Sequence, residues 1–381
     1  MTNYNDFQCL ESTNSLYVDK KPDGYDIKPC CLYKGDTGKV KTIEQLLDNP
    51  TINKIKKGFT ENWKNNPSCN DCVRNEKMGK SSQRLRSLDL GYDGKIVRWD
   101  IRPGNTCNLK CAMCHISNSS KWLEDIDILT KYTNNVDTLR WTNNILNDAR
   151  SRENLDWNWI YERCIDTAQF IYIAGGEPFY MKNVQEFLNK LSSNQWNQNN
   201  TRIQIQTNGV SNTPKFLDIL SRFKRLEFNI SVDGWNEVNE LIRFPTDHND
   251  WIKNVNQLMQ LNPYDIFFNI TVQVMNLPNI DELIKNLKDR WNGKYEIHKL
   301  YYPLYLSLNA LNPYIIKAVS QSTKIIELQN FCNDYTYNEN LNKTMQEYLL
   351  DLDKKRKTNS KKIIPWCFIN RVKRRREREL V

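Results

Sequence analysis

The alternation of apolar runs with amphipathic helices between residues 95 and 302 is the feature that most constrains the fold of this 381-residue chain. Runs of strand length recur six times, and from the second onward each follows helical material. Such units predict a parallel sheet with helices outside it. Six units cannot close an eight-stranded barrel, so we expect an α/β fold with a partial, TIM-like (β/α)6 barrel and its site at the C-terminal strand ends. The predicted strands are 95–101, 168–174, 203–209 with its turn, 226–232, 266–274 and 295–302.

Three cysteines lie on the segment directly after the first predicted strand. Cys107, Cys111 and Cys114 have the spacing C-x3-C-x2-C. Three thiolates on one loop can hold three corners of an iron–sulfur cubane, which would leave the fourth iron open to a small molecule. A zinc site with His115 as the fourth ligand is the alternative. The lack of a second cysteine pair nearby argues against zinc.

Polar motifs follow the next three predicted strands. A Gly-Gly-Glu-Pro element comes after the second strand, a Thr-Asn-Gly turn after the third, and a Ser-x-Asp-Gly element ends the fourth. Each motif alone is typical of an ordinary turn. Because the C-terminal ends of parallel strands meet at one edge, their joint occurrence indicates a single site. The residues concerned are Gly175, Gly176, Glu177, Thr207, Asn208, Ser231, Asp233 and, twelve residues beyond Ser231, Arg243.

The first ninety residues contain a second group of cysteines and read as a separate module. Cys9 comes first, Cys30 and Cys31 are adjacent, and Cys69 and Cys72 form a C-x2-C pair. Such a pair binds either zinc or an iron–sulfur cluster, and the spacing does not distinguish the two. We therefore expect three units: a cysteine-rich module over 1–90, the barrel over 91–303, and a helical extension with a basic tail over 304–381.

Composition narrows the class of protein. The chain has 11 cysteines and no visible secretory signal, so the thiols read as reduced groups or metal ligands in a cytoplasmic protein. No apolar run is long enough to span a membrane. The net charge of +9 includes the dense basic run 371–378. That run is typical of a solvated terminal helix, and a nucleic-acid contact is the alternative.

The remaining cysteines and the C-terminal acidic residues carry weaker signals. Cys164 and Cys332 lie in helical surroundings and are expected to be buried small hydrophobes. Cys367 fits either a core position or an additional ligand of the N-terminal cysteine group. Asp351 and Asp353 precede a basic triplet and are expected on a solvated helix face.

Taken together, the cysteine triplet and the motifs after the strands resemble those of radical S-adenosylmethionine (SAM) enzymes over residues 95–303. One departure is Met113, where the family often has an aromatic residue before the third cysteine. The N-terminal module resembles the auxiliary-cluster half-modules called twitch or SPASM domains, with Gly24 shortly before Cys30. In well-known members that module follows the barrel, whereas here it precedes it.

The resemblance implies the cofactors and the site residues. Cys107, Cys111 and Cys114 would bind a [4Fe–4S] cluster whose open iron takes SAM. The Gly-Gly-Glu element would bind the SAM amino end, and Ser231 and Arg243 the ribose and carboxylate end. The resemblance favours an auxiliary iron–sulfur cluster over zinc in the N-terminal module. The expected metal ligands of this auxiliary cluster are Cys9, Cys30, Cys69 and Cys72.

The resemblance also implies a reaction and partners. SAM would be cleaved reductively to a 5′-deoxyadenosyl radical, which takes a hydrogen atom from the substrate. A low-potential, flavodoxin- or ferredoxin-like protein would supply the electron. Auxiliary modules of this kind favour a peptide or protein substrate. The alternatives are a nucleotide- or RNA-modifying enzyme, motivated by the basic tail, and a non-catalytic metal-stabilised binding protein.

Overall fold

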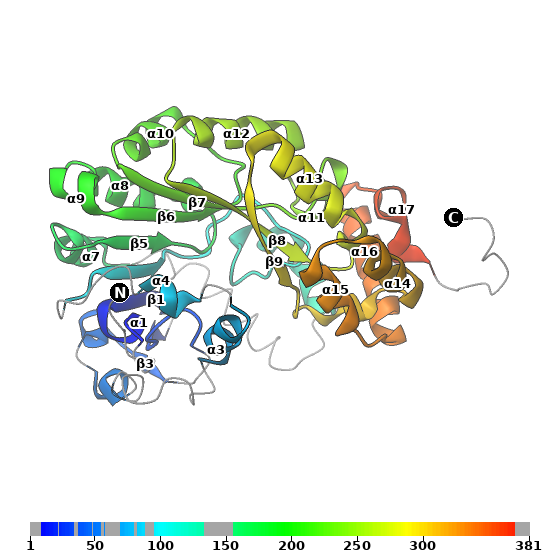
Figure 1. The fold of residues 1–381 in the computed structure, drawn as a ribbon, viewed down its shortest axis with the longest axis horizontal. Helices are drawn as coiled ribbons and strands as arrows, with labels where there is room; N and C mark the ends of the chain where they lie inside the picture. Colours follow the sequence, from blue (N-terminus) through cyan, green and yellow to red (C-terminus); the bar gives the residue numbers. More distant parts are fainter. Residues whose placement is uncertain are drawn as a thin grey trace.

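The structure is a computed structural model that describes residues 9–21, 23–33, 37–47, 49–54, 57, 69–79, 82–87, 95–132 and 155–369. Its centre is one sheet with the strand order β3-β2-β1-β4-β5-β6-β7-β8-β9 (Figure 1). The strands are β1 (Ser15–Lys21), β2 (Gly24–Asp26), β3 (Lys39–Val40), β4 (Arg98–Arg102), β5 (Phe170–Ile173), β6 (Arg202–Thr207), β7 (Arg225–Ser231), β8 (Asp265–Val272) and β9 (Lys294–Lys299).

Strands β4 to β9 pair in parallel in the order of the sequence, which confirms the predicted α/β partial barrel. Helices lie between successive strands, and Figure 1 shows α8, α10, α12 and α13 on one side of the sheet. The helices of this part are α5 (Ile126–Tyr132), α7 (Trp157–Cys164), α8 (Lys182–Leu191), α9 (Gln195–Asn200), α10 (Pro214–Ser221), α11 (Glu237–Ile242), α12 (His248–Gln260) and α13 (Ile280–Trp291). The short 3-10 helices are η5 (Ser120–Asp125), η6 (Pro178–Tyr180) and η7 (Leu277–Asn279).

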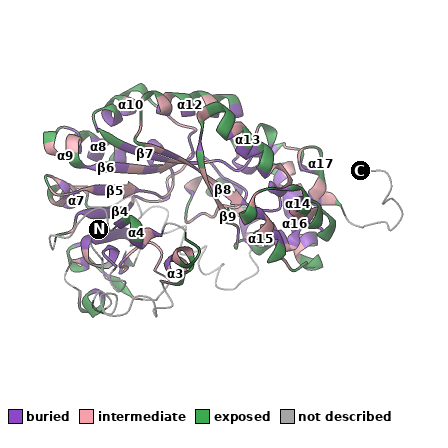
Figure 2. Ribbon diagram, in the orientation of Figure 1, coloured by how far each residue is buried: buried purple, intermediate pink, exposed green. Residues whose placement is uncertain are grey.

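Alternating burial along the strands gives the sheet two chemically different faces. In β8 every second side chain is buried, and β6 has the same period of two. The buried set, which includes Ile205 and Phe268, belongs to the main hydrophobic core (Figure 2). The other set of β4–β9, mostly polar and partly exposed, points the opposite way. We call this second surface the inner face.

The outer helices form where apolar spacing and capping residues coincide. In α8 the buried residues Val184, Phe187, Leu188 and Leu191 repeat at helical spacing. Helix α10 begins after Thr213, whose side chain accepts a hydrogen bond from Phe216 N, and proline occupies its first turn. These helices bury the outer face of the sheet, so the polar inner face is left for other contacts.

The N-terminal segment joins the same sheet, which the sequence did not predict. β1 pairs with β4 in parallel and β2 returns antiparallel to β1, so backbone pairing crosses the boundary expected near residue 90. A buried ion pair of 2.8 Å joins Glu11 in α1 (Glu11–Asn14) to Arg98 in β4. The other elements of this segment are η1 (Glu44–Leu46), α3 (Asn70–Lys77) and α4 (Gln83–Ser87). In Figure 1 they lie below the strands, away from α10 and α12.

Residues after β9 form the predicted helical extension. It comprises η8 (Leu304–Leu306), η9 (Leu308–Ala310), α14 (Pro313–Ser322), α15 (Ile326–Asn333), α16 (Glu339–Arg356), α17 (Ser360–Ile363) and η10 (Pro365–Phe368). Helix α16 contacts α5, the helix that follows the three-cysteine loop. The basic run 371–378 lies outside the described residues. Among the helices that the structure describes, none is long and apolar enough to cross a membrane.

Candidate functional site: the three-cysteine loop and the strand ends

The loop with Cys107, Cys111 and Cys114 follows β4, as predicted, and its backbone is fixed to a distant segment. Lys110 N donates to Phe244 O over 2.7 Å, and Ala112 N donates to Ile242 O over the same distance. These bonds bracket Cys111, which is buried. The loop is therefore attached to the end of α11, directly beside Arg243.

Side chains from three other places bind carbonyls of the same loop. Ser119 Oγ donates to Leu109 O, and Trp122 Nε1 donates to Cys111 O over 3.1 Å. The hydroxyl of Tyr348, on α16, donates to Ala112 O over 2.7 Å. Each bond satisfies a carbonyl that a loop would otherwise expose to water. The loop is consequently held in one conformation from several sides.

The three thiols lie close enough to influence one another. Burial, and after it the neighbouring Cys111, raise the pKa of Cys107 to about 12. Burial raises the pKa of Cys114 further, with Cys111 and Cys107 as the next causes. Metal ligation requires the deprotonated thiolate, so these raised pKa values mean that binding a cationic cluster must displace tightly held protons. Within the described residues, no group of three or more Cys, His, Asp or Glu side chains is arranged so that it could hold a metal ion.

Gly176 lies where only glycine fits beside the loop. Its φ is +54°, and a Cβ there would lie 2.3 Å from Thr106 O. The next amide, Glu177 N, donates to that same oxygen over 2.8 Å. Gly175 also has a positive φ, and a Cβ there would lie 3.2 Å from Gly104 O. The glycine pair therefore lets the end of β5 contact the cysteine loop backbone to backbone.

The buried Glu177 carboxylate connects two strand ends. Its Oε1 accepts from Thr207 Oγ1 over 2.7 Å and from Phe179 N over 3.0 Å, while Oε2 accepts from Asn208 N over 2.6 Å. Burial raises the pKa of this carboxyl to about 7 and outweighs the three donors, which lower it. A carboxylate has about four acceptor positions, so these bonds leave one for a ligand. Binding of a SAM amino group there stays a prediction.

Asn208 extends this contact to the cysteine loop itself. Its Nδ2 lies 2.8 Å from Asn108 Oδ1 and 4.0 Å from Cys107 Sγ. Its carbonyl accepts from Trp251 Nε1 over 3.1 Å. The Thr-Asn-Gly turn is thus in direct contact with the first cysteine. Trp251 belongs to a cluster of buried aromatic side chains, and no local sequence signal indicated this role.

Asp233 and Arg243 form a buried ion pair at the end of β7. Arg243 Nε lies 2.8 Å from Asp233 Oδ2, and Arg243 Nη1 lies 4.0 Å from Cys111 Sγ. Asp233 Oδ1 accepts from Thr271 N over 2.7 Å, which connects the pair to β8. Ser231 is partly exposed on the inner face, where its Oγ accepts from Gln206 Nε2 over 2.7 Å. Asp233 and Arg243 thus reach the cysteine loop, and Ser231 points to the inner face beside them.

The N-terminal cysteines meet in a second place. Cys9 and Cys72 share a small buried cluster against which Cys69 packs. Burial raises the pKa of Cys30, and among the further causes are Cys31 and Cys9. Cys30 therefore lies near the group. This arrangement matches the four predicted positions, although their ligand role stays a prediction.

Cys31 faces elsewhere. Burial raises its pKa to about 12, the charge of Asp100 in β4 raises it as well, and that of Arg102 lowers it. The charged groups that act on Cys31 thus include two from β4, whereas those that act on Cys30 include Cys9. The choice of Cys30 over Cys31 as a ligand stays a prediction.

The other three cysteines belong to the main hydrophobic core. Cys164 and Cys332 are buried there, as predicted. Cys367 is fully buried in the same core, and its thiol donates to Val274 O over 3.4 Å. Of its two interpretations, the structure supports the core position.

Comparison with known proteins identifies a family domain in the part of the chain that holds this site. Residues 101–289 match the family model described as the radical SAM superfamily. A search of curated proteins gives no match. One solved structure that resembles the chain is native anSMEcpe with bound AdoMet and the Cp18Cys peptide, at 17% identity and a TM-score of 0.38, covering 59% of this chain and 58% of that one. The chain thus spans less than two thirds of that protein.

Two further structures are similar to the chain at a comparable level. Streptococcus suis SuiB bound to S-adenosylmethionine has 11% identity and a TM-score of 0.37, with 71% of this chain and 61% of that one covered. HemN from Escherichia coli, a coproporphyrinogen III oxidase described as a radical SAM enzyme, has 13% identity and a TM-score of 0.34, covering 68% and 52%. Residues 101–289, which include the three-cysteine loop and the strand-end motifs, thus form a radical SAM domain.

Proposed function

We propose that the chain uses the loop of Cys107, Cys111 and Cys114 to cleave SAM reductively and to take hydrogen from a peptide or protein. The observation that supports this choice of site is that residues from several strand ends contact the same loop. The ends of β5 and β6 contact this one loop through Gly176 and Asn208, and Arg243, which pairs with Asp233 after β7, lies 4.0 Å from Cys111 Sγ. The residues present fit both cofactors, since three thiols stand free of disulfides beside a glycine-lined backbone and a buried cation.

The roles of the individual groups follow from their chemistry. The three thiolates would hold the cluster, which when bound supplies the electron for C–S cleavage of SAM. Glu177 keeps one acceptor position for an ammonium group. Arg243 offers a guanidinium that suits a carboxylate, and Ser231 offers a hydroxyl that suits a ribose. The backbone at Gly175 and Gly176 allows a ligand to approach closely.

Anaerobic reconstitution tests this proposal. The purified protein is loaded with iron and sulfide and given SAM with a strong reductant, and 5′-deoxyadenosine is measured. We expect its formation in the wild type and its loss in Cys107→Ala, Cys111→Ala and Cys114→Ala variants. Cys31→Ser is the matched control and keeps the activity. Equal 5′-deoxyadenosine from wild type and the three alanine variants would reject the site.

The second cysteine group supports an auxiliary iron–sulfur cluster as part of the proposal. Cys9, Cys69 and Cys72 lie together, and Cys9 is close enough to Cys30 to raise the pKa of its thiol. We expect Cys30→Ser to lose about half of the bound iron while Cys31→Ser keeps it all. Mössbauer spectra of the wild type distinguish a cluster from zinc. Full iron retention in Cys30→Ser, or zinc in place of the second cluster, would contradict this assignment.

The inner face favours a peptide over a nucleic acid. Four of its basic side chains are each paired with a carboxylate at 2.8–3.0 Å, namely Arg98, Arg102, Arg202 and Lys294. Paired cations offer little attraction to a phosphate backbone. Nearer the site the face carries neutral hydrogen-bonding groups, the chemistry that peptide groups satisfy. These are Gln206, Asn229, Ser231, Asn269 and Thr271.

Isotope transfer tests the substrate class. A perdeuterated peptide mixture and a perdeuterated RNA pool are each incubated with the loaded enzyme, SAM and reductant. We expect deuterium in 5′-deoxyadenosine only from peptides. Deletion of residues 371–381 should leave this transfer unchanged. Transfer from RNA, lost together with salt-dependent RNA binding on that deletion, would favour the nucleic-acid alternative.

The physiological electron source belongs to the same proposal. Reduction of such a cluster needs a strongly negative donor, which a flavodoxin- or ferredoxin-like protein supplies. We expect either protein, with its reductase, to replace the chemical reductant in the 5′-deoxyadenosine assay. Failure of both donors where the chemical reductant succeeds would exclude this class of partner.

A further inference from the structure

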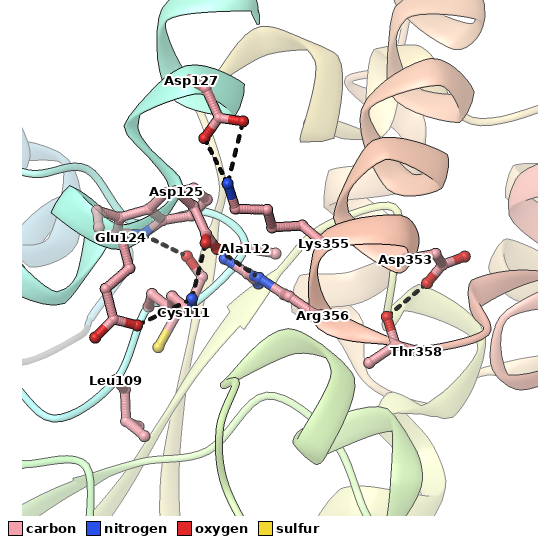
Figure 3. Close-up of polar contacts among 12 residues, drawn as sticks. Leu109, Cys111, Ala112, Glu124, Asp125, Asp127, Asp353, Lys355, Arg356 and Thr358 are labelled. Atoms are coloured by element: carbon pink, nitrogen blue, oxygen red, sulfur yellow. Dashed lines mark hydrogen bonds and ion pairs between the residues drawn. The ribbon is translucent and has the colours of Figure 1, made fainter.

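A buried charge network joins the cysteine loop to the C-terminal extension (Figure 3). Lys110, the residue before Cys111, has its Nζ 2.8 Å from Asp125 Oδ1. The other oxygen of Asp125 lies 3.1 Å from Nε of Arg356, the last residue of α16. The three charged side chains are all at least nine-tenths buried. A segment more than 230 residues away in the sequence therefore completes the surroundings of Cys111.

The buried members of this network carry an excess of positive charge. One carboxylate, Asp125, serves two cations, and the second carboxylate near Lys110, Glu124, is half exposed. Among the described residues, the two Nη atoms of Arg356 have no hydrogen-bond partner. The guanidinium instead lies 4.8 Å from the ring centre of Trp122 and 5.2 Å from that of Phe244. Arg356 is thus a cation held in an apolar setting.

The field of Arg356 reaches a cluster ligand. Both rings that its guanidinium faces belong to residues bonded to the cysteine loop, since Trp122 Nε1 donates to Cys111 O and Phe244 O accepts from Lys110 N. Arg243 is neutralised by its own carboxylate, Asp233, whereas Arg356 shares Asp125 with Lys110. A buried charge acts over several ångströms because the interior screens it weakly. The charge of Arg356 is therefore available to whatever negative group Cys111 holds.

The same helix also fixes the backbone on the other side of Cys111. Tyr348 lies on α16 two turns before Arg356, and its hydroxyl binds Ala112 O. Arg356 acts through Lys110, and Tyr348 acts through Ala112, so α16 holds both neighbours of this one cysteine.

We infer that α16 positions the cluster-binding loop and that Arg356 sets the reduction potential of the cluster that Cys111 ligates. The inference rests on the proposed function of that loop. Arg356 is a positioning residue, since it acts through Asp125, Lys110 and its own field and touches no reacting atom in the structure. Reduction adds one negative charge to the cluster, and a nearby buried cation stabilises that state, so Arg356 raises the potential.

Two substitutions of opposite sign test the electrostatic part. Arg356→Gln removes a buried cation, and Asp125→Asn removes a buried anion with almost no change in shape. The midpoint potential of the reconstituted cluster is measured by redox titration followed by electron paramagnetic resonance. We expect a lower potential in Arg356→Gln and a higher one in Asp125→Asn. The expected size is about tenfold in the equilibrium constant for one-electron reduction, or about 59 mV.

The controls separate charge from damage to the fold. Arg356→Lys keeps the charge and should keep the potential close to that of the wild type. Lys355→Gln removes the neighbouring, exposed pair with Asp127, whose Nζ–Oδ1 distance is 3.1 Å, and should change nothing. A general loosening of the loop would move the Arg356→Gln and Asp125→Asn potentials in the same direction. That result, or no movement in either variant, would overturn the inference.

Tyr348→Phe removes the hydrogen bond from α16 to Ala112 O without altering charge, and so tests the positioning role of the helix. Hydrogen–deuterium exchange of the peptide that spans residues 107–114 should be faster than in the wild type, with the metal-free protein already showing the effect. Unchanged exchange would overturn the positioning role of α16. A wild type that binds no iron rejects the proposed function, whereas a loaded wild type whose variants share one potential rejects only the role of Arg356.

Discussion

The guanidinium of Arg243 forms a 2.8 Å ion pair with the fully buried carboxylate of Asp233, beside the cysteine loop. Breaking a buried pair leaves one charge without compensation. We expect Arg243→Leu to lower the free energy of unfolding of the metal-free protein by about 3–5 kcal/mol. Arg222→Leu, which removes the exposed 2.6 Å pair with Asp218, should cost about 0–1 kcal/mol. Denaturant titration measures both, and equal losses would contradict the burial argument.

Gly176 should not tolerate a side chain. In Gly176→Ala the new Cβ would overlap Thr106 O and the positive φ would be strained, for a total cost of about 2–5 kcal/mol. Gly38→Ala is the matched control, since Gly38 has a φ of +77° and nothing within 4 Å of a Cβ. It should show only the strain, about 1–2 kcal/mol. We also expect less iron in the Gly176 variant, as measured after reconstitution. An equal loss in the free energy of unfolding at both sites would show that the loop moves to accommodate the methyl group at residue 176.

Glu177→Gln should weaken the joint between β5 and β6. A glutamine side chain has one acceptor oxygen, so an N–H or O–H donor that now binds the carboxylate would face an NH2 group. The expected cost is about 1.5–3 kcal/mol in the free energy of unfolding. Thr207→Val, which removes one donor, should cost about 1 kcal/mol. Exchange of the Asn208 amide hydrogen should accelerate in Glu177→Gln, and an unaltered exchange rate would argue against the bond.

His248 should make stability depend on pH. Its ring stacks on Trp251 at 5.5 Å, and neither ring nitrogen has a hydrogen-bond partner in the described residues. Burial, with Arg290 as the next cause, lowers its pKa from 6.5 to about 4. Between these values the unfolded chain binds more protons, so stability falls as the pH is lowered from about 6.5 to about 4.

His248→Phe is the variant that checks this expectation. It keeps the aromatic packing and removes the titration, so its free energy of unfolding should vary less over that pH range than that of the wild type. Denaturant titrations at pH 7, 6 and 5 make the comparison. An identical slope in His248→Phe would assign the pH dependence to other groups.

The barrel and its cysteine loop could be predicted because their signals are local. Strand periodicity repeats within each βα unit, and the Gly-Gly-Glu and Thr-Asn-Gly motifs each stand directly after a strand. The contact of Tyr348 with the loop and that of Arg356 with Asp125 could not be predicted, since each joins residues more than 230 positions apart. Nothing in α16 itself distinguishes an arginine that reaches a buried aspartate from one that faces water.

Two acidic residues on α16 also have partners that the sequence did not predict. Asp351 and Asp353 were expected on a solvated face, and the structure shows both partly exposed but bonded to specific partners. Asp351 accepts from Lys131 Nζ at 2.5 Å and Tyr132 OH at 2.6 Å, and Asp353 accepts from Thr358 Oγ1 at 2.6 Å. Charge patterning along one helix predicted exposure, whereas the partners come from α5 and from the turn after α16.

The parallel pairing of β1 with β4 has a practical consequence for anyone dissecting this chain. A gene fragment that starts at residue 91 would produce a barrel whose first strand has lost its neighbour. The backbone donors and acceptors along that side of β4 would then be open to strands of other molecules. Such a fragment should aggregate on expression even though it contains Cys107, Cys111 and Cys114. Fragments for crystallisation or for partner screening are better begun ahead of Cys9.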